Sequence, residues 1–294
     1  MSRYEPAIDV AAVRAIDSHV HVQFDSTGRH SLPQELFDAM DRYFGQGTPA
    51  LSVDDLAAYY RERSMAAVVF TVDARTAMGV APNSSAEIAE GAARHPDVLI
   101  PFGSVDPNTG GAAIDLAREL AIEHGVRGFK FHPSIQRFDP SDPAFAPLWA
   151  AITELGVPIV VHTGQTGVGA GMPGGYGIKL RYSNPMLLDD VAADFPDLTI
   201  ILAHPSVPWQ DEALSMAAHK ANVFIDLSGW APKYFSTELV RQAGSILQRK
   251  MLFGSDYPAL SPDRWLSDFE QLPIKDGARP KILKENAARV LGLA

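Results

Sequence analysis

The chain contains no cysteine, and this single absence removes a group of chemistries. None of its 294 residues is cysteine, so it can form no disulfide and has no thiolate nucleophile or thiolate metal ligand. Any bound metal would therefore need nitrogen and oxygen ligands.

Excess positive charge and long apolar runs are also missing. The net charge of -10 argues against nucleic acid or an anionic membrane as a bulk partner. A few local cations could still bind a small anion. No apolar run approaches about 18 residues, and the segment Met1–Pro6 has no apolar signal core. We therefore expect a cytoplasmic protein that does not interact with membranes.

A nucleotide-binding loop is the third absence. No Gly-x-Gly-x-x-Gly motif follows an early apolar run, and the glycine-rich stretch Gly167–Gly175 is not followed by the lysine of a phosphate-binding loop. This argues against a doubly wound α/β sheet, which is the structural alternative to the fold predicted below.

Short apolar runs recur along the chain and alternate with segments of helical periodicity. They are apolar on successive residues, as expected for parallel strands buried on both faces. Eight strands are predicted: Val13–Ile16, Ala66–Thr71, Val98–Val105, Val126–Phe131, Pro158–His162, Leu198–His204, Val223–Leu227 and Met251–Gly254. The predicted helices are Val53–Ser64, Ser84–His95, Ala112–His124, Phe145–Leu155, Pro185–Phe195, Gln210–Ala221, Ser236–Leu247 and Asp276–Leu291.

Eight strand–helix units in 294 residues predict the α/β class and a single (β/α)8 TIM barrel domain spanning residues 1–294. The segment Gln23–Ser52 is then a long insertion after the first strand, and we expect it to form a partial lid. The glycine-rich stretch belongs to a second long loop, Gly164–Asn184, after the fifth strand.

Histidines and an aspartate follow several predicted strands directly. His19 and His21 follow the first strand, His162 and His204 end the fifth and sixth, and Asp256 follows the eighth. Catalytic groups of such barrels lie at the carboxyl ends of the strands, and two residues spaced i, i+2 on a strand face the same side. Each residue alone could be a turn or capping residue. Five potential ligands on one rim of the barrel together predict a metal site.

Four motifs in this order resemble the amidohydrolase superfamily. The resemblance is to the branch of amidohydrolase-related proteins that includes aminocarboxymuconate semialdehyde decarboxylase, and it spans essentially the whole chain. The motifs are Asp17-Ser-His19-Val-His21, Val161-His162-Thr-Gly, Ala203-His204-Pro and Phe253-Gly-Ser-Asp256-Tyr-Pro.

The resemblance implies one divalent metal ion held by His19, His21, His162 and Asp256. Zinc is the usual ion of this branch, with Mn2+ or Fe2+ as alternatives. His204, with a pKa expected near neutrality, would act as an acid/base or as an additional ligand. Asp256 could also accept a proton from bound water. Neutral imidazoles leave such a zinc site positively charged, which acidifies the water.

Lys130 ends the fourth strand and is predicted to bind the substrate. In related binuclear enzymes a carbamylated lysine at this place bridges two metals, so a binuclear site is the alternative. A lysine here more simply binds a carboxylate or phosphate, or steadies an enolate. His132, two residues on, is interpreted as a loop residue ahead of Pro133.

Four further residues are predicted to contact the substrate. Lys179, Arg181 and Tyr182 lie in the long loop after the fifth strand, and Trp230 follows the seventh. Solvation of the cations and packing of the aromatic rings would explain them equally well. The substrate is expected to be a small anionic or aromatic molecule, and the resemblance implies a homodimer.

Three functions fit these residues. The first is a hydrolase in which metal-activated water attacks the carbonyl of an ester, lactone, amide or activated C–C bond, such as that of an aryl β-ketoacyl thioester. The second is a metal-dependent non-oxidative decarboxylase, and the third is a non-catalytic metal-binding partner subunit. The His-x-His pair and the cation-bearing loop favour the hydrolase, acting in catabolism of aromatic or carboxylated intermediates.

Overall fold

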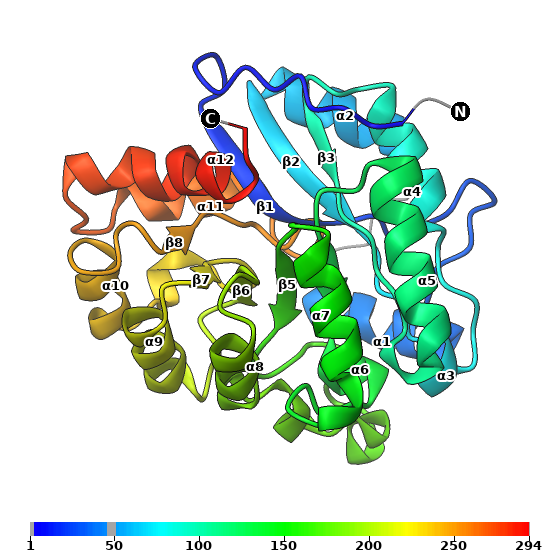
Figure 1. Cartoon of the computed structure of the whole chain (residues 1–294). Coiled ribbons are helices and arrows are strands. Elements are labelled where there is room, and N and C mark those ends of the chain that lie inside the picture. The colour runs from blue at the N-terminus through cyan, green and yellow to red at the C-terminus, as the bar shows by residue number, and fades with distance from the viewer. Residues whose placement is uncertain (1–2, 46–50, 294) are drawn as a thin grey trace.

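The computed structural model describes residues 3–45 and 51–293 and shows the predicted TIM barrel (Figure 1). In this part of the chain the strands are β1 (Ala15–His21), β2 (Met65–Phe70), β3 (Leu99–Pro101), β4 (Phe129–Phe131), β5 (Ile159–His162), β6 (Ile200–Ala203), β7 (Val223–Asp226) and β8 (Met251–Leu252). All pair in parallel, in the orders β1-β2-β3 and β4-β5-β6-β7-β8.

Backbone hydrogen bonds join the two sets of strands at both seams. The Gly103 N–H donates to the Gly128 carbonyl at 2.9 Å, between β3 and β4. On the other side, the Ser18 N–H donates to the Phe253 carbonyl at 2.9 Å, between β1 and the residue after β8. The carboxyl ends of the strands are thereby brought to one rim.

Helices surround the barrel. The α-helices are α1 (Gln34–Phe44), α2 (Val53–Glu62), α3 (Arg75–Met78), α4 (Ser85–Ala93), α5 (Gly111–Glu119), α6 (Pro133–Gln136), α7 (Ala146–Glu154), α8 (Asp189–Asp194), α9 (Gln210–His219), α10 (Thr237–Ala243), α11 (Pro262–Glu270) and α12 (Asn286–Val290). Short 3-10 helices are η1 (Pro107–Thr109), η3 (Pro143–Phe145), η4 (Pro173–Gly177), η5 (Leu180–Ser183), η6 (Pro185–Leu188), η7 (Pro232–Tyr234) and η8 (Asp276–Ala278), and π-helical turns are η2 (Leu120–His124) and η9 (Lys281–Glu285).

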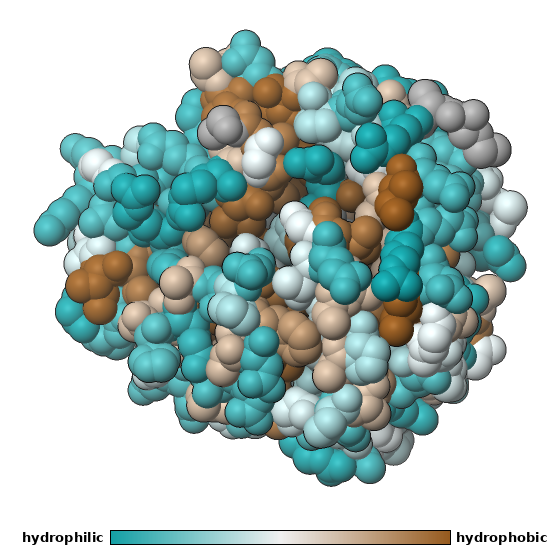
Figure 2. All heavy atoms as spheres, viewed as in Figure 1, coloured by the Kyte–Doolittle hydropathy of each residue, from teal (hydrophilic) through white to brown (hydrophobic). Residues whose placement is uncertain are grey.

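Side-chain alternation along the strands divides the apolar core into two layers. On β2, Val68 and Phe70 belong to the cluster inside the barrel, whereas Ala67 and Val69 belong to the cluster between strands and helices. Every residue of β2 is buried, which explains its unbroken apolar sequence. Figure 2 shows hydrophilic residues over most of the outer helices on the face in view.

The first strand differs from the prediction. It was expected at Val13–Ile16 with both histidines after its end, but β1 spans Ala15–His21, so both histidines lie within the strand. Its register against β2 shifts between Asp17 and Val20, which marks a β-bulge. The predicted strand ended too early because the polar residues after Ile16 resemble a turn.

Several predicted helices are shorter or differently built. The Pro185–Phe195 helix is a 3-10 turn followed by α8, and the Asp276–Leu291 helix divides into η8, η9 and α12. Helix α11 was missed, although Ser261 caps it by accepting from the Arg264 N–H. The insertion predicted as a lid contains α1, and its residues 46–50 lie outside the described part.

No helix in the described ranges is both long and apolar enough to cross a membrane.

Candidate metal and active site

The bulge in β1 sets the direction of the two histidines that begin the site. Strict alternation from the inward-facing Ile16 would turn His19 outward, and the register shift turns it inward instead. The imidazole rings of His19 and His21 lie 5.2 Å apart, and each contacts the ring of Phe70 edge-on. Both rings therefore lie over the apolar interior of the barrel.

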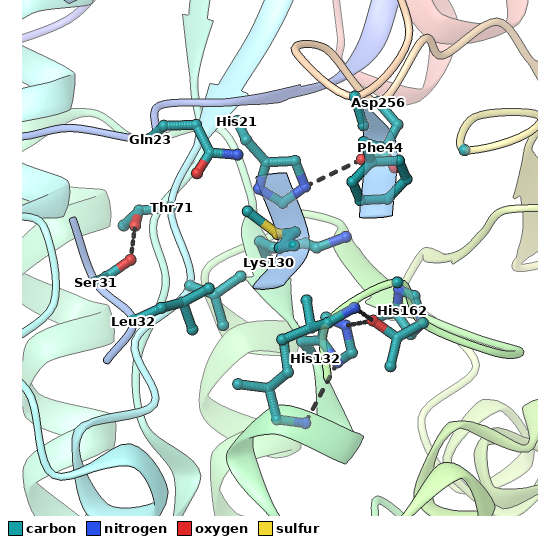
Figure 3. A pocket seen from close by; sticks show the side chains of 18 of the residues that line it. His21, Gln23, Ser31, Leu32, Phe44, Thr71, Lys130, His132, His162 and Asp256 are labelled. Atoms are coloured by element: carbon teal, nitrogen blue, oxygen red, sulfur yellow. Dashed lines mark hydrogen bonds and ion pairs between the residues drawn. The ribbon is translucent and has the colours of Figure 1, made fainter. Parts of the chain in front are cut away.

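Asp256 joins this pair from the loop after β8. One carboxylate oxygen, Oδ1, lies 3.4 Å from His19 Nε2 and 3.2 Å from His21 Nε2. Figure 3 shows the contact with His21. The Asp256 N–H donates to the His19 carbonyl at 3.0 Å, which fixes the loop against β1. His19, His21 and Asp256 thus form a group of three donors that could hold a metal ion.

Two of the site residues hold an uncommon backbone conformation. Asp256 has φ 69° and His204 has φ 71°, in the left-handed region that non-glycine residues rarely adopt. Gly229 allows His204 its position, because a Cβ on Gly229 would lie 2.5 Å from His204 Nδ1. Such conformations persist where surrounding contacts impose them, as they often do at functional sites.

His162 lies beside His204 and apart from the first group. Its Nδ1 is 3.0 Å from His204 Nε2, and the rings meet edge to face. The other face of His162 stacks on His132, with the ring centres 3.7 Å apart. His162 was predicted as a ligand together with His19 and His21, and it belongs to neither compact donor group among the described residues. His132, interpreted from sequence as a loop residue, is part of the site.

Two residues on and after β7 belong to the site and were missed by the sequence analysis. Asp226 Oδ2 lies 2.6 Å from His19 Nδ1, and Ser228 Oγ contacts His19 Nδ1 at 3.1 Å and His204 Nδ1 at 2.9 Å. Asp226 was contained in the predicted strand Val223–Leu227 and read as part of it. An acidic residue near the end of an apolar run is the signal that would have found it.

Lys130 lies at the floor of the site with no exposed surface. Its Nζ is 3.0 Å from His19 Nε2, and Figure 3 shows it between His21 and His132. Burial lowers the pKa of Lys130 to about 8, against the opposing charges of Asp226 and Asp256. The ammonium group and a metal ion would compete for the same lone pair on His19.

Asp17 ties the bulge to the loop that carries Asp256. It accepts hydrogen bonds from the Tyr60 hydroxyl at 2.8 Å and from the hydroxyl and N–H of Ser255, at 2.6 and 2.9 Å. Burial raises the pKa of Asp17 to about 7, although these hydrogen bonds act in the opposite direction. The network holds β1 and the Asp256 loop in register.

Burial and neighbouring charges keep the imidazoles of His19, His162 and His204 neutral and the carboxyl of Asp256 ionised. Burial lowers the pKa of His19 and of His162 well below 6.5, with Lys130 adding to the effect on His19 and His132 to that on His162. Burial also lowers the pKa of His204, so the expected value near neutrality is too high. Burial would raise the pKa of Asp256, but the His21 hydrogen bond and the imidazoles outweigh it.

A cavity of about 250 Å³ opens over these groups. Its floor contains Lys130, Asp256 and four histidines of the site, which are His21, His132, His162 and His204. Its walls are largely apolar and aromatic, and include Leu32, Met40, Tyr43, Phe44, Val72, Ile135, Val168 and Trp230. The described lining residues include two of the predicted substrate contacts, Lys130 and Trp230. They do not include Lys179, Arg181 or Tyr182, whose roles stay predictions.

Arg181 and Tyr182 contact one another instead. The Arg181 guanidinium lies 4.7 Å from the centre of the Tyr182 ring and donates to its hydroxyl at 3.2 Å. Lys179 and Arg181 are both exposed.

The donor set suits a divalent transition metal. Nitrogen and oxygen ligands without thiolate match zinc, manganese or iron(II). Neutral imidazoles and an ionised carboxylate are the protonation states that metal binding requires. His19, His21 and Asp256 already converge within contact distance, so the residues present fit such an ion. His204 lies next to this group, with its ring centre 4.9 Å from that of His19, and His162 contacts His204 on the other side.

A curated relative and several solved structures resemble this chain. It is 27% identical to Protein fluG of Emericella nidulans over 123 residues, which is 40% of this chain and 13% of that protein. The chain therefore spans a small part of that relative's length.

The similar structures share the fold. An uncharacterized TIM-barrel protein from Bordetella bronchiseptica is 24% identical, with a TM-score of 0.76 and coverage of 95% of this chain and 98% of that one. A dihydroxybenzoic acid decarboxylase from Polaromonas, solved with manganese and an inhibitor, is 18% identical, with a TM-score of 0.65 and coverage of 96% and 97%. A probable 2-pyrone-4,6-dicarboxylic acid hydrolase from Acinetobacter baumannii is 16% identical, with a TM-score of 0.62 and coverage of 95% and 100%.

The family itself is shown by sequence. The profile of the Amidohydrolase family matches residues 16–293, which begin within β1 and include every strand-end residue described above. With the barrel and the converging histidines and aspartate, this match shows that the chain belongs to the amidohydrolase family.

Proposed function

We propose that the protein is a metal-dependent hydrolase that cleaves a small aromatic or carboxylated substrate at a carbonyl group. The observation that carries the proposal is the position of Asp256. Its carboxylate touches the His19–His21 pair and also lines the cavity. It is therefore placed to accept a proton from a water molecule beside a substrate.

The cavity supports a substrate with one anionic or carbonyl end. Lys130 is the single lysine or arginine among the described residues that line it, and the walls above it are apolar and aromatic. A ring would pack against the apolar wall, which includes Phe44 and Trp230, and its polar end would reach Lys130. A molecule with several negative charges would find too few cations here.

The chain's residues divide the chemistry between them. A divalent ion held by His19, His21 and Asp256, with His162 nearby, would polarise a carbonyl and acidify water. Asp256 holds the proton that is removed from the water. Lys130 binds the negative end of the substrate, and the apolar walls exclude bulk water.

A decarboxylase is the second candidate, and the buried Lys130 favours it. Its ammonium group could hold a substrate carboxylate against the apolar wall, or return a proton to carbon after carbon dioxide leaves. The decarboxylase from Polaromonas shares only the fold at its level of identity, so the reaction must be decided by experiment.

Isotope incorporation distinguishes the two reactions. The purified protein would be freed of metal with a chelator, reloaded with Zn2+ or Mn2+, and assayed in H218O against aryl esters, lactones, aryl β-ketoacyl thioesters and hydroxybenzoates. Hydrolysis places one 18O in the product acid. Decarboxylation releases carbon dioxide and leaves no 18O in the aromatic product. Asp256→Asn, which keeps the shape of the side chain, should lower the hydrolytic rate by about 100-fold or more.

We further propose that the protein is a cytoplasmic homodimer. Light scattering coupled to size-exclusion chromatography at micromolar concentration tests the oligomeric state, and a monomer of 31.8 kDa would contradict it.

A further inference from the structure

Asp226 and Ser228 contact two histidines of the site but are not among the described residues that line the cavity. Both side chains have no exposed surface. The Ser228 N–H donates to Asp226 Oδ1 at 2.8 Å, so the two residues form one unit at the end of β7. This unit touches His19 and His204 on their Nδ1 atoms, on the side of each ring opposite Nε2.

The contacts of His19 determine which of its nitrogens carries the proton. A carboxylate only accepts hydrogen bonds and an ammonium group only donates them. Asp226 Oδ2 lies 2.6 Å from Nδ1, so Nδ1 carries the hydrogen. Lys130 Nζ lies 3.0 Å from Nε2, so Nε2 presents its lone pair. The same lone pair faces Asp256, where a metal ion would bind.

The Ser228 hydroxyl, which contacts both rings, determines which nitrogen of His204 carries the proton. His19 Nδ1 already donates, so the Ser228 hydrogen has no acceptor there and is directed to His204 Nδ1, 2.9 Å away. His204 then carries its hydrogen on Nε2, which donates to His162 Nδ1 at 3.0 Å. The opposite tautomer of His204 would leave the Ser228 hydroxyl without an acceptor among its described contacts, at a buried position where such a loss is costly.

We propose that Asp226 and Ser228 are positioning residues that fix the tautomers of two histidines, with the proton of His19 on Nδ1 and the proton of His204 on Nε2. Fixing His19 in this way prepares its Nε2 for a metal ion, as partners of metal-binding histidines commonly do. Fixing His204 makes its Nε2 a hydrogen-bond donor toward His162, and both rings line the cavity.

A division of roles follows, and this step rests on the proposed function. As a neutral Nε2–H donor, His204 would stabilise negative charge on a substrate carbonyl oxygen, in exchange for its hydrogen bond to His162. It does not remove the proton from water, which leaves Asp256 as the base. The sequence alone did not decide whether His204 acts as an acid, a base or a metal ligand.

The tautomers can be read directly by NMR, without a substrate. Protein with 15N-labelled histidine would be studied at pH 7.5, metal-free and loaded with Zn2+, by long-range 1H–15N correlation. We assign the signals of His204 by their loss in His204→Asn. The expected wild-type spectrum shows a protonated Nε2 and an unprotonated Nδ1 for His204. A protonated Nδ1 would overturn the assignment, whether or not any hydrolytic activity has been found.

Variants test the two positioning residues separately. Ser228→Ala should release His204 from its single tautomer, and Ser228→Thr, which keeps the hydroxyl, should restore it. Ser215→Ala is a matched control, because Ser215 donates only to the carbonyl of Asp211 in its own helix. An unchanged His204 spectrum in Ser228→Ala would refute the role of Ser228.

Asp226→Asn tests the role of Asp226 through the affinity of the protein for metal. We expect the Kd for Zn2+, measured by competition with a chromogenic chelator, to rise about 10- to 100-fold. A purely structural role would lower the unfolding midpoint without changing the Kd of the folded protein. Unchanged zinc affinity would therefore refute the role of Asp226.

Discussion

Replacing Gly229 by alanine tests the placement of His204 with a single methyl group. The new Cβ would lie 2.5 Å from Nδ1 of the His204 ring, whereas ordinary contact needs about 3.4 Å. The ring would have to move by roughly 0.9 Å. That movement breaks the hydrogen bond between Ser228 Oγ and His204 Nδ1.

Two costs add in this variant. Gly229 has φ 72°, and an L-residue there costs about 1–2 kcal/mol. A buried hydrogen-bonding group left without its partner costs about 1–3 kcal/mol more. We expect a loss of about 2–5 kcal/mol in unfolding free energy. A displacement approaching 1 Å should lower kcat/KM about 100-fold.

Gly156→Ala separates the two costs. Gly156 has φ 67° but nothing within 4 Å of a Cβ, so its replacement carries the backbone cost alone. Urea unfolding of both variants and of the wild type measures the stabilities, and kcat/KM is measured on the substrate found by the isotope assay. Full activity in Gly229→Ala would refute the reasoning that His204 must occupy its observed position.

Three further predictions concern protonation, metal binding and the buried network. In the metal-free protein the pKa of Lys130 is about 8, against 10.5 for an ordinary lysine, so the unfolded chain binds more protons between these values. Stability should therefore rise with pH across this window, by about 3 kcal/mol, and urea unfolding at a series of pH values should show a smaller rise in Lys130→Met. His204→Ala should keep one metal per chain by elemental analysis while activity falls about 100-fold or more; stoichiometric loss of metal would make His204 a ligand. Tyr60→Phe should lower the unfolding free energy by about 1–3 kcal/mol, because buried Asp17 loses a donor at 2.8 Å; an unchanged urea midpoint would contradict this.

The sequence predicted the barrel well because its signals are local. A run of successive apolar residues marks a strand buried on both faces, and each of the eight predicted strands corresponds to a strand of the structure. The boundaries were less accurate where polar residues continue a strand, as in β1. Helices such as α11 were missed, although Ser261 gave a capping signal.

The site was predicted in part for a related reason. The histidines and Asp256 could be found because their type and their place at the end of an apolar run are visible in the sequence. Lys179 and Arg181 were chosen by charge alone, and they are exposed and outside the described cavity lining. Charge does not show where a side chain in a long loop points.

What the sequence determined by itself is the set of candidate ligands and the rim on which they lie. What only the tertiary structure decided is how they face one another. The bulge in β1 turns His19 inward, and closure of the barrel brings Asp226 to His19 across 207 positions of sequence and Lys130 to it across 111. These contacts depend on the register of strands that are distant in the chain. A local pattern of residue types cannot encode that register, because it is fixed only when all the strands pack around one core.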